Sequence, residues 1–211
     1  TNTDEILISE SLQNAPEICM VSVSEIQKYK HNIIVWDNKQ GVNIDHFKVY
    51  RMDHATNFFK FIASVDADSA GIFTDMDIKA NPVTKSDFYK LSMVDICGNE
   101  TELSPEHKTL HLTRNQGVNN EVNLIWENYI GFDYASYKVW RGHHIDSLIE
   151  IDVVSNLINT YTDPAAPKRR PLYYNITVNL PGICLDDNKG SERGPYAMSR
   201  SNIEDAGAVE E

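Results

Sequence analysis

The sequence predicts an all-β protein made of two tandem antiparallel β-sandwiches, and three observations support this prediction. The two halves of the 211-residue chain repeat one pattern, as in Trp36 and Trp126, which are 90 positions apart. The expected strands are short, alternate apolar with polar residues, and are rich in β-branched and aromatic side chains. Turn signals separate them every ~10 to 15 residues with no convincing helix between, which favours antiparallel sandwiches over parallel βαβ units.

In the first unit, four successive strands are each expected to bury one face. The residues expected to point inward are Ile34 and Trp36, then Phe47 and Val49, then Phe59 and Phe61, and last Tyr89, Leu91 and Met93. Turn-forming segments rich in Asn, Asp and Gly lie between these strands, for example at 38–41 and 97–99. Such alternation predicts a sandwich in which one face of each sheet contributes to a shared core.

The second unit repeats this inward set. Its expected core residues are Val122, Leu124, Trp126, Tyr137, Val139, Ile149, Ile151, Tyr174, Ile176 and Val178. The offset between the copies falls from 90 residues at the tryptophans to 85 at Tyr89 and Tyr174, so we infer one template with small deletions in its loops. Units of about 90 to 100 residues are long enough to fold around their own cores.

We expect four parts along the chain: a leader or linker at 1–14, a first domain at 15–113, a second domain at 114–203 and an acidic tail at 204–211. The composition of the tail predicts disorder. The connector at 113–120 is short. Such a linker leaves the domains little freedom, so a fairly fixed end-to-end pair is expected.

Both units resemble fibronectin type III domains, over residues 15–203. The matching elements are the strand-B tryptophans, the aromatic-x-Val-x-Arg motifs of strand C at 47–51 and 137–141, the Thr-Asp pairs of strand E, the strand-F tyrosines, and the segment 95–104. The resemblance implies two immunoglobulin-like sandwiches in which Trp36 and Trp126 pack between the sheets. It also implies that Tyr89 and Tyr174 are tyrosine-corner residues, whose hydroxyl bonds to nearby backbone.

The segments 107–112 and 199–203 are similar to those of bacterial versions found in exported and cell-surface proteins. This similarity implies a secreted or surface-attached protein, and a start at Thr1 without Met leaves room for an upstream lipid anchor. We therefore expect a non-catalytic module for adhesion, ligand recognition or domain presentation, with an unknown protein or glycan as partner. The alternative is an accessory carbohydrate-binding or spacer module of a polysaccharide-processing system.

Bulk composition argues against several other classes. The formal charge of −12 comes without a basic face in either half, so nucleic acid is not an expected partner. No apolar stretch approaches the ~18 residues needed to cross a bilayer, so no transmembrane segment is expected. We expect a monomer.

No metal site, cofactor or catalytic centre is expected. His107 and His111 would lie about 13 Å apart along one face of a strand, too far for one ion. The Asp-rich loop at 66–77 imitates the start of an EF-hand but lacks the ligands expected at its fifth and last positions, which leaves only a loose surface calcium site as an alternative. Ser, His and Asp occur without a nucleophile elbow or a compact pairing, which argues against an enzyme.

An aromatic B–C loop in the second unit is the strongest binding candidate. It places Tyr129, Phe132 and Tyr134 together, and the outward Trp140 on the next strand would extend the patch. Exposed rings flanked by carboxylate and amide groups stack on sugar faces or anchor protein partners. The alternative is that Tyr129 and Phe132 seal the contact between the domains, while Trp140 covers its own sheet.

The three cysteines are too few for a disulfide scaffold. In the resembled fold, Cys19 in strand A and Cys97 at the end of strand F fall near the same pole. The resemblance therefore implies a Cys19–Cys97 bridge, which would close a loop of about 78 residues and add about 4 kcal/mol in the loop-entropy model. The alternative is three buried reduced thiols, and Cys184 has no partner in its own unit.

Overall fold

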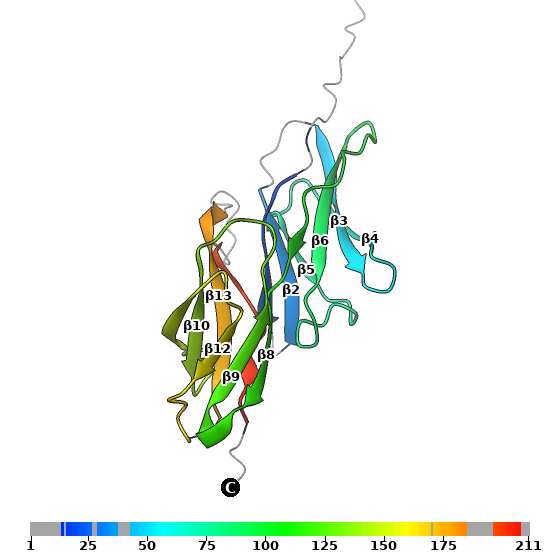
Figure 1. The fold of residues 1–211 in the computed structure, drawn as a ribbon. Helices are drawn as coiled ribbons and strands as arrows, with labels where there is room; N and C mark the ends of the chain where they lie inside the picture. The colour runs from blue at the N-terminus through cyan, green and yellow to red at the C-terminus, as the bar shows by residue number, and fades with distance from the viewer. Residues whose placement is uncertain are drawn as a thin grey trace, which may run out of the picture.

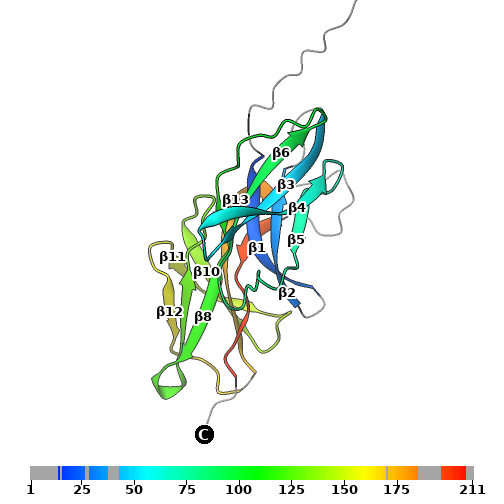
Figure 2. The same cartoon turned by 90° about the vertical axis from the view of Figure 1, so that its right-hand side faces the viewer.

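A computed structural model describes residues 14, 16–26, 29–37, 43–169, 171–184 and 196–207 of the chain. Throughout this part the regular structure is β-strand, apart from one 3-10 turn at Val118–Asn120. The strands form two sandwiches, visible as an upper and a lower lobe in Figure 1 and turned by 90° in Figure 2. The expected leader, apart from Asn14, and residues 208–211 of the expected tail lie outside the described residues.

The first sandwich packs a three-stranded sheet on a four-stranded sheet. In spatial order, the three-stranded sheet contains β1 (Ile18–Ile26), β2 (Tyr29–Trp36) and β5 (Ile72–Asp75). The four-stranded sheet contains β4 (Phe58–Asp66), β3 (Ile44–Asp53), β6 (Phe88–Asp95) and β7 (His107–Lys108). All of these neighbours pair antiparallel.

The second sandwich repeats this arrangement. Its smaller sheet contains β8 (His111–Gln116), β9 (Val122–Glu127) and β12 (Thr160–Asp163). Its larger sheet contains β11 (Ile149–Ser155), β10 (Ser136–Gly142), β13 (Tyr173–Cys184) and β14 (Tyr196–Arg200), and β15 (Glu204–Asp205) also pairs with β13. These pairings are antiparallel as well.

Strands A-B-E face strands C′-C-F-G in both copies, which is the arrangement of fibronectin type III domains. The predicted fold class is therefore confirmed. Each core is built around a tryptophan that is 2 % exposed. The ring of Trp36 meets Phe47 edge-on with centroids 5.5 Å apart, and Trp126 meets Tyr137 in the same way at 5.1 Å. Such edge-to-face pairs are favoured by the quadrupoles of aromatic rings.

The inward assignment is wrong for both expected positions of β4 and for one of β11. Phe61 is 53 % exposed and Ile149 is 63 % exposed. Phe59 pairs with Met52, and its ring lies 4.9 Å from the ammonium of Lys90, on the outer face. A β-bulge in the β3–β4 pairing places Phe61 directly opposite Tyr50, and the two rings meet on the outer face. A corresponding bulge in the β10–β11 pairing changes the register beside Ile149. A bulge inserts one residue and so reverses the faces of the residues beyond it.

The limits of the second unit differ from those expected. β8 begins at His111 and pairs with β9, so a division between 113 and 114 falls inside a strand of the second sandwich. Residues 204–205, expected to be disordered, form β15 instead. Ala206 is 3 % exposed, and its N–H donates to the carbonyl of Leu172 over 2.7 Å. Backbone pairing with β13 therefore holds this part of the acidic segment in the fold.

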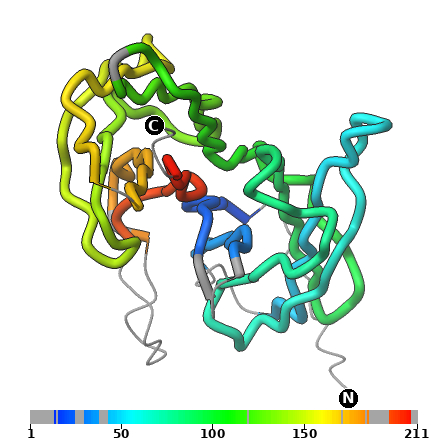
Figure 3. Tube along the Cα trace, turned by 90° about the horizontal axis from the view of Figure 1, so that it is seen from below, coloured from blue at the N-terminus to red at the C-terminus, as the bar shows by residue number. Residues whose placement is uncertain are grey.

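The two sandwiches lie side by side rather than in the expected end-to-end order. Figure 3 shows the first and the last strands of the chain adjacent between the two lobes. The Ser199 hydroxyl donates to the carbonyl of Val21 over 2.6 Å, and the N–H of Arg200 donates to Ser22 Oγ over 3.0 Å. We call this contact of β1 and β2 with β13 and β14, together with the adjoining B–C loop of the second sandwich, the seam.

The sequence of β2 explains why a seam forms. Ile34 and Trp36 point into the first core, whereas Ile33 and Val35 point the other way and yet are only 7 % and 3 % exposed. They join Met20 in a second apolar cluster that includes residues of β13 and β14. A strand with two apolar faces needs cover on both sides, and the second sandwich provides it.

Candidate functional site at the seam

The repeated Arg, Asp and Tyr motifs form a structural triad in the first core. Arg51 donates to Asp75 over 2.6 Å, and the Tyr89 hydroxyl donates to the same carboxylate oxygen over 2.9 Å. Arg51 also reaches Asp77 at 2.8 Å. Burial raises the pKa of Tyr89 well above its usual value, and the nearby carboxylates of Asp75 and Asp87 act in the same direction. The hydroxyl therefore stays protonated as a donor.

The second core contains the same triad. Arg141 donates to Asp163 over 2.7 Å, and Tyr174 donates to that carboxylate over 2.8 Å. The tyrosine-corner expectation is thus wrong for Tyr89, whose hydroxyl bonds to side chains rather than to nearby backbone, and the Tyr174 hydroxyl donates to the matching carboxylate. The reason is the buried Asp of the Thr-Asp motif, which lies within reach of both partners and whose oxygens need hydrogen-bond donors inside the core. These residues hold the cores together.

The B–C loop of the second sandwich enters the seam. Tyr129 is 3 % exposed, and its hydroxyl accepts a hydrogen bond from the N–H of Val21 over 3.2 Å. The ring of Phe132 lies 4.4 Å from that of Tyr129. Tyr134 instead shares a 2.6 Å hydrogen bond with Tyr137 of its own sandwich. The structure therefore places Tyr129 and Phe132 between the sandwiches, where Tyr129 is buried and Phe132 is partly buried.

A buried histidine completes this contact. His107 Nδ1 lies 2.9 Å from the Tyr129 hydroxyl, and burial lowers the pKa of His107 to about 4. Gly131 has φ +141°, and a Cβ added there would lie 2.2 Å from His107 Nδ1. Only glycine combines that backbone conformation with so close an approach. No local pattern indicates this packing, because His107 precedes the loop by more than twenty residues.

A polar cluster lies at the other side of the B–C loop. Ser86 of the first sandwich donates to Glu127 of the second over 2.8 Å, and Lys108 pairs with Glu127 at 2.9 Å. Partial burial acts to raise the pKa of Glu127, but hydrogen bonds from Lys108 and Ser86 outweigh it and lower that pKa. His111 lies 3.5 Å from the same carboxylate. The carboxylate thus links the two sandwiches.

A disulfide bond joins Cys19 to Cys184 across the seam, with Cα atoms 5.6 Å apart. The expected Cys19–Cys97 bridge is therefore wrong, because Cys97 is a free, exposed thiol in the turn after β6. Cys19 packs with the apolar cluster on the outer face of the first sandwich, where it meets the end of β13. Cys184 has its partner in the other unit, which pairing within each repeat does not suggest.

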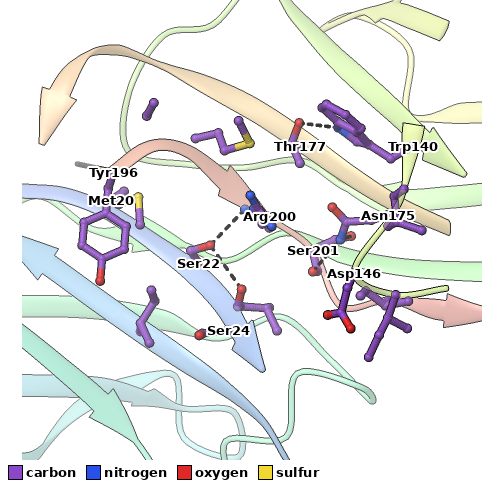
Figure 4. Close-up of a pocket in the computed structure, with 17 residues that line it drawn as sticks. Met20, Ser22, Ser24, Trp140, Asp146, Asn175, Thr177, Tyr196, Arg200 and Ser201 are labelled. Atoms are coloured by element: carbon purple, nitrogen blue, oxygen red, sulfur yellow. Dashed lines mark hydrogen bonds between the residues drawn. The ribbon is translucent and has the colours of Figure 1, made fainter. Parts of the chain in front are cut away.

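A cleft of about 720 Å³ opens along the seam. One wall is the outer face of β1 and β2, and the other is the outer face of β10, β13 and β14 (Figure 4). Trp140 lines this cleft, and its indole N–H donates to Thr177 Oγ1 over 2.9 Å. Tyr129 and Tyr134 border a different hollow, beside Lys108. The four aromatic candidates therefore do not form one site.

The described residues contain no group of three or more His, Cys, Asp or Glu side chains placed to hold a metal ion. In the same part of the chain, no helix has the length and apolar character to cross a membrane.

Comparison with known proteins assigns the chain to no family. No protein-family model and no curated protein sequence matches the chain. A chicken CNTN1 fragment with domains FN1–FN3 aligns with 92 % of this chain at 12 % identity and a TM-score of 0.34. The aligned part is 65 % of that fragment.

Two further solved structures align over similar lengths. A two-domain fibronectin type III segment of chicken tenascin aligns with 91 % of this chain and 97 % of its own at 13 % identity and a TM-score of 0.31. The chicken interferon gamma receptor alpha chain aligns with 90 % and 97 % at 11 % identity and a TM-score of 0.32. The fold assignment rests on the strand order given above.

Proposed function

We propose that this chain is a non-catalytic recognition and presentation module of an exported bacterial surface protein. The observation that carries the proposal is the Cys19–Cys184 bond between the two sandwiches. Disulfides form and persist outside the cytoplasm, in oxidising compartments, and are rare in cytosolic proteins. The bacterial assignment is supported by the similarity of the segments 107–112 and 199–203 to exported bacterial versions of the fold.

The contacts at the seam support a role in which two rigidly joined sandwiches present a ligand or another domain. Backbone and side-chain hydrogen bonds, the apolar cluster around Met20 and the disulfide all join the same two surfaces. A covalent link between domains that also share an apolar contact removes most of their relative motion. Whatever the module carries or binds would therefore be held at a fixed distance and orientation.

The chemistry of the buried groups supports a non-catalytic role. The buried carboxylates of Asp75 and Asp163 are each held by an arginine and a tyrosine inside a core. His107 is enclosed by the B–C loop and is neutral near pH 7. These groups are occupied by structural partners and have no path to a substrate. The accessory carbohydrate-binding alternative is favoured by one observation, the Trp140-lined cleft.

The redox state of the cysteines in the producing cell tests this proposal. Intact cells are treated with an alkylating reagent, and mass spectrometry then reads the three thiols. We expect Cys97 alkylated, and Cys19 and Cys184 linked. A membrane-impermeant biotin reagent should label the protein on intact cells. Finding all three thiols reduced in the producing cell, or the protein shielded from the impermeant reagent, would contradict export to the surface.

Small-angle scattering tests the rigid arrangement. The wild-type chain should fit one compact side-by-side arrangement, with and without added ligand. The double variant Cys19→Ser/Cys184→Ser should show a larger average dimension, because only non-covalent contacts then hold the seam. The variant Cys97→Ser, which removes an exposed thiol, is the matched control and should scatter as the wild type does. Equal flexibility of wild type and double variant would contradict a disulfide-locked pair.

A further inference from the structure

The cleft along the seam has the size and position of a ligand site. Its volume of about 720 Å³ falls in the range of about 300 to 1,000 Å³ typical of small-molecule sites. Its walls come from both sandwiches, so the cleft exists only in the side-by-side arrangement. Figure 4 shows Met20 and Tyr196 toward one end of it, and Trp140, Asn175 and Asp146 toward the other.

Trp140 provides a fixed aromatic surface in this cleft. Its N–H is already bonded to Thr177, so the polar edge of the indole is satisfied and the ring is held in place. The ammonium of Lys138 lies 5.9 Å from the ring centroid and pairs with Glu150 at 2.9 Å. What the indole offers a ligand is its apolar surface, which suits the C–H face of a sugar ring.

The charged groups of the lining balance one another. Arg200 and Asp146 both border the cleft, and neither has an ion-pair partner among the described residues. A ligand with a net charge would pair with the oppositely charged one of these side chains and would place a like charge near the other. A neutral molecule that both donates and accepts hydrogen bonds satisfies the two together. Vicinal hydroxyl groups have this property.

The rest of the lining is amphipathic. Ser24 provides a hydroxyl group, while Met20 and Met198 provide apolar surface. The hydroxyl groups of Ser22 and Ser201 are already bonded within the fold. The amide nitrogen of Asn175 is held by Ser201 at 3.1 Å, so the orientation of this side chain is fixed. Both walls are also fixed relative to one another by the disulfide, and a preorganised site loses little entropy on binding.

We propose that the cleft binds a short neutral oligosaccharide, which stacks on Trp140 and hydrogen-bonds through its hydroxyl groups to Asp146, Asn175 and Arg200. This proposal rests on the recognition function proposed above and names its ligand class. On the matched face of the first sandwich, the hydroxyl of Tyr50, the counterpart of Trp140, instead donates to Glu100 over 2.6 Å.

Nuclear magnetic resonance titration of the full chain tests the proposal. The probes are maltotriose, cellotriose, xylotriose and N-acetylated chitotriose, all neutral, with 3′-sialyllactose as the anionic and deacetylated chitotriose as the cationic comparison. The reporter is the indole N–H resonance of Trp140, assigned from its loss in Trp140→Ala. We expect saturable shifts of this resonance with at least one neutral trisaccharide and weaker or absent shifts with the charged ones.

Matched variants identify the site by titration calorimetry. Trp140→Ala should weaken binding roughly tenfold or more, as removal of a central aromatic contact does. Arg200→Gln should weaken binding several-fold, and Tyr50→Ala, at the matched position of the first sandwich, should leave it unchanged. Because Arg200 is an exposed side chain, its variant keeps the test valid if Trp140→Ala does not fold.

Three results would overturn the proposal. They are no binding of any neutral trisaccharide, preferential binding of a charged one, and binding that neither Trp140→Ala nor Arg200→Gln weakens. The cysteine redox test is independent of this outcome. Oxidised Cys19 and Cys184 without sugar binding would remove this ligand assignment alone, whereas reduced cysteines with sugar binding would remove the proposed export and keep the cleft as a sugar site.

Discussion

On the outer face of the first sandwich, Lys48, Tyr50 and Ser92 each donate a 2.6 Å hydrogen bond to Glu100. Partial burial acts to raise the pKa of Glu100, but the hydrogen bonds from Lys48, Ser92 and Tyr50 outweigh it and lower the pKa to about 2. The polar groups of this face therefore satisfy one another.

At the matched positions of the second sandwich stand Lys138, Trp140 and Thr177. These three side chains do not share one carboxylate acceptor. Lys138 pairs with Glu150, and Trp140 donates to Thr177. This face borders the cleft instead. The two copies thus have nearly equal cores but different outer faces. The polar groups of one face bond to one another, and the other face borders a cavity.

Removal of the arginine should give the largest difference between the two core triads in the free energy of unfolding. Arg51 is 9 % exposed and binds two carboxylates, Asp75 and Asp77, whereas Arg141 is 20 % exposed and binds one, Asp163. Loss of a buried ion-pair partner costs about 3–5 kcal/mol. We expect Arg51→Met to cost that much and Arg141→Met about 1–3 kcal/mol, because water reaches the second triad more easily.

Urea unfolding of the full chain measures these losses, and hydrogen exchange followed by mass spectrometry assigns each loss to its sandwich. Lys60→Met, on the exposed side of β4, is the control for removing a basic residue and should change little. Equal losses for Arg51→Met and Arg141→Met would mean that the two triads contribute alike.

His107 and Glu204 should change the free energy of unfolding with pH in opposite directions. They occupy matched positions, opposite Tyr89 and Tyr174. Burial lowers the pKa of His107 to about 4 and raises the pKa of Glu204, so burial favours the neutral form of both. For His107, the unfolded chain binds the proton first, so stability falls as pH drops from about 6.5 to about 4, by about 3 kcal/mol.

Glu204 acts in the opposite direction, since its raised folded-state pKa makes stability fall as pH rises through that pKa. Unfolding free energies measured between about pH 4 and 7 test both statements. His107→Gln should flatten the acid side of the profile, and Glu204→Gln should leave the His107 step in place. If the wild-type profile shows no acid step, or if His107→Gln does not remove that step, the burial of a neutral His107 is contradicted.

Replacement of the two triad tyrosines should give a smaller difference in the free energy of unfolding. The Tyr89 hydroxyl donates to Asp75 and accepts a hydrogen bond from Asn32 over 3.0 Å. The counterpart of Asn32, by the 90-residue offset, is Val122, which offers no such donor. We expect Tyr89→Phe to cost about 2 kcal/mol and Tyr174→Phe about 1 kcal/mol in urea unfolding. The reverse order would show that the Asn32 contact contributes nothing to stability.

The smallest effect should come from the outer face of the first sandwich. Glu100→Gln weakens the charge-assisted bonds from Lys48 and Tyr50, but the carboxylate is one-third exposed. We expect a loss of about 1 kcal/mol or less, reduced further by salt. Binding of any ligand in the cleft should be unaffected, because the residue lies on the other sandwich. A change in ligand affinity would show that the two outer faces are coupled.

The fold and the cores could be predicted from the sequence because local patterns determine them. Alternation places Ile34 and Trp36 on one face of a strand, and the repeat doubles every such signal. The exceptions are Phe59 and Phe61 in β4 and Ile149 in β11, and each of these strands has a bulge in its pairing. A bulge depends on pairing between strands distant in the chain, which periodicity within one strand does not reveal.

The seam was largely missed, because it is a property of two surfaces that meet only in the folded pair. One signal was present: Ile33–Trp36 is a continuous apolar run, which indicates a strand covered on both faces. The resemblance implies Cys97 as the partner of Cys19 because both lie near one pole of a single sandwich, whereas the side-by-side arrangement places Cys184 next to Cys19. Trp140 was recognised as outward-facing, but its cleft needs the wall that β1 and β2 supply.

The Cys19–Cys184 bond also has a mechanical consequence. It joins residues 165 positions apart, one in the first strand and the other at the end of β13. A pull on the chain from either side of these cysteines therefore passes through a covalent bond and bypasses nearly all of both sandwiches. The length withheld from extension is about 550 Å, at about 3.3 Å per residue. Under tension, the disulfide-linked pair would act as a stiff link that lengthens only after reduction.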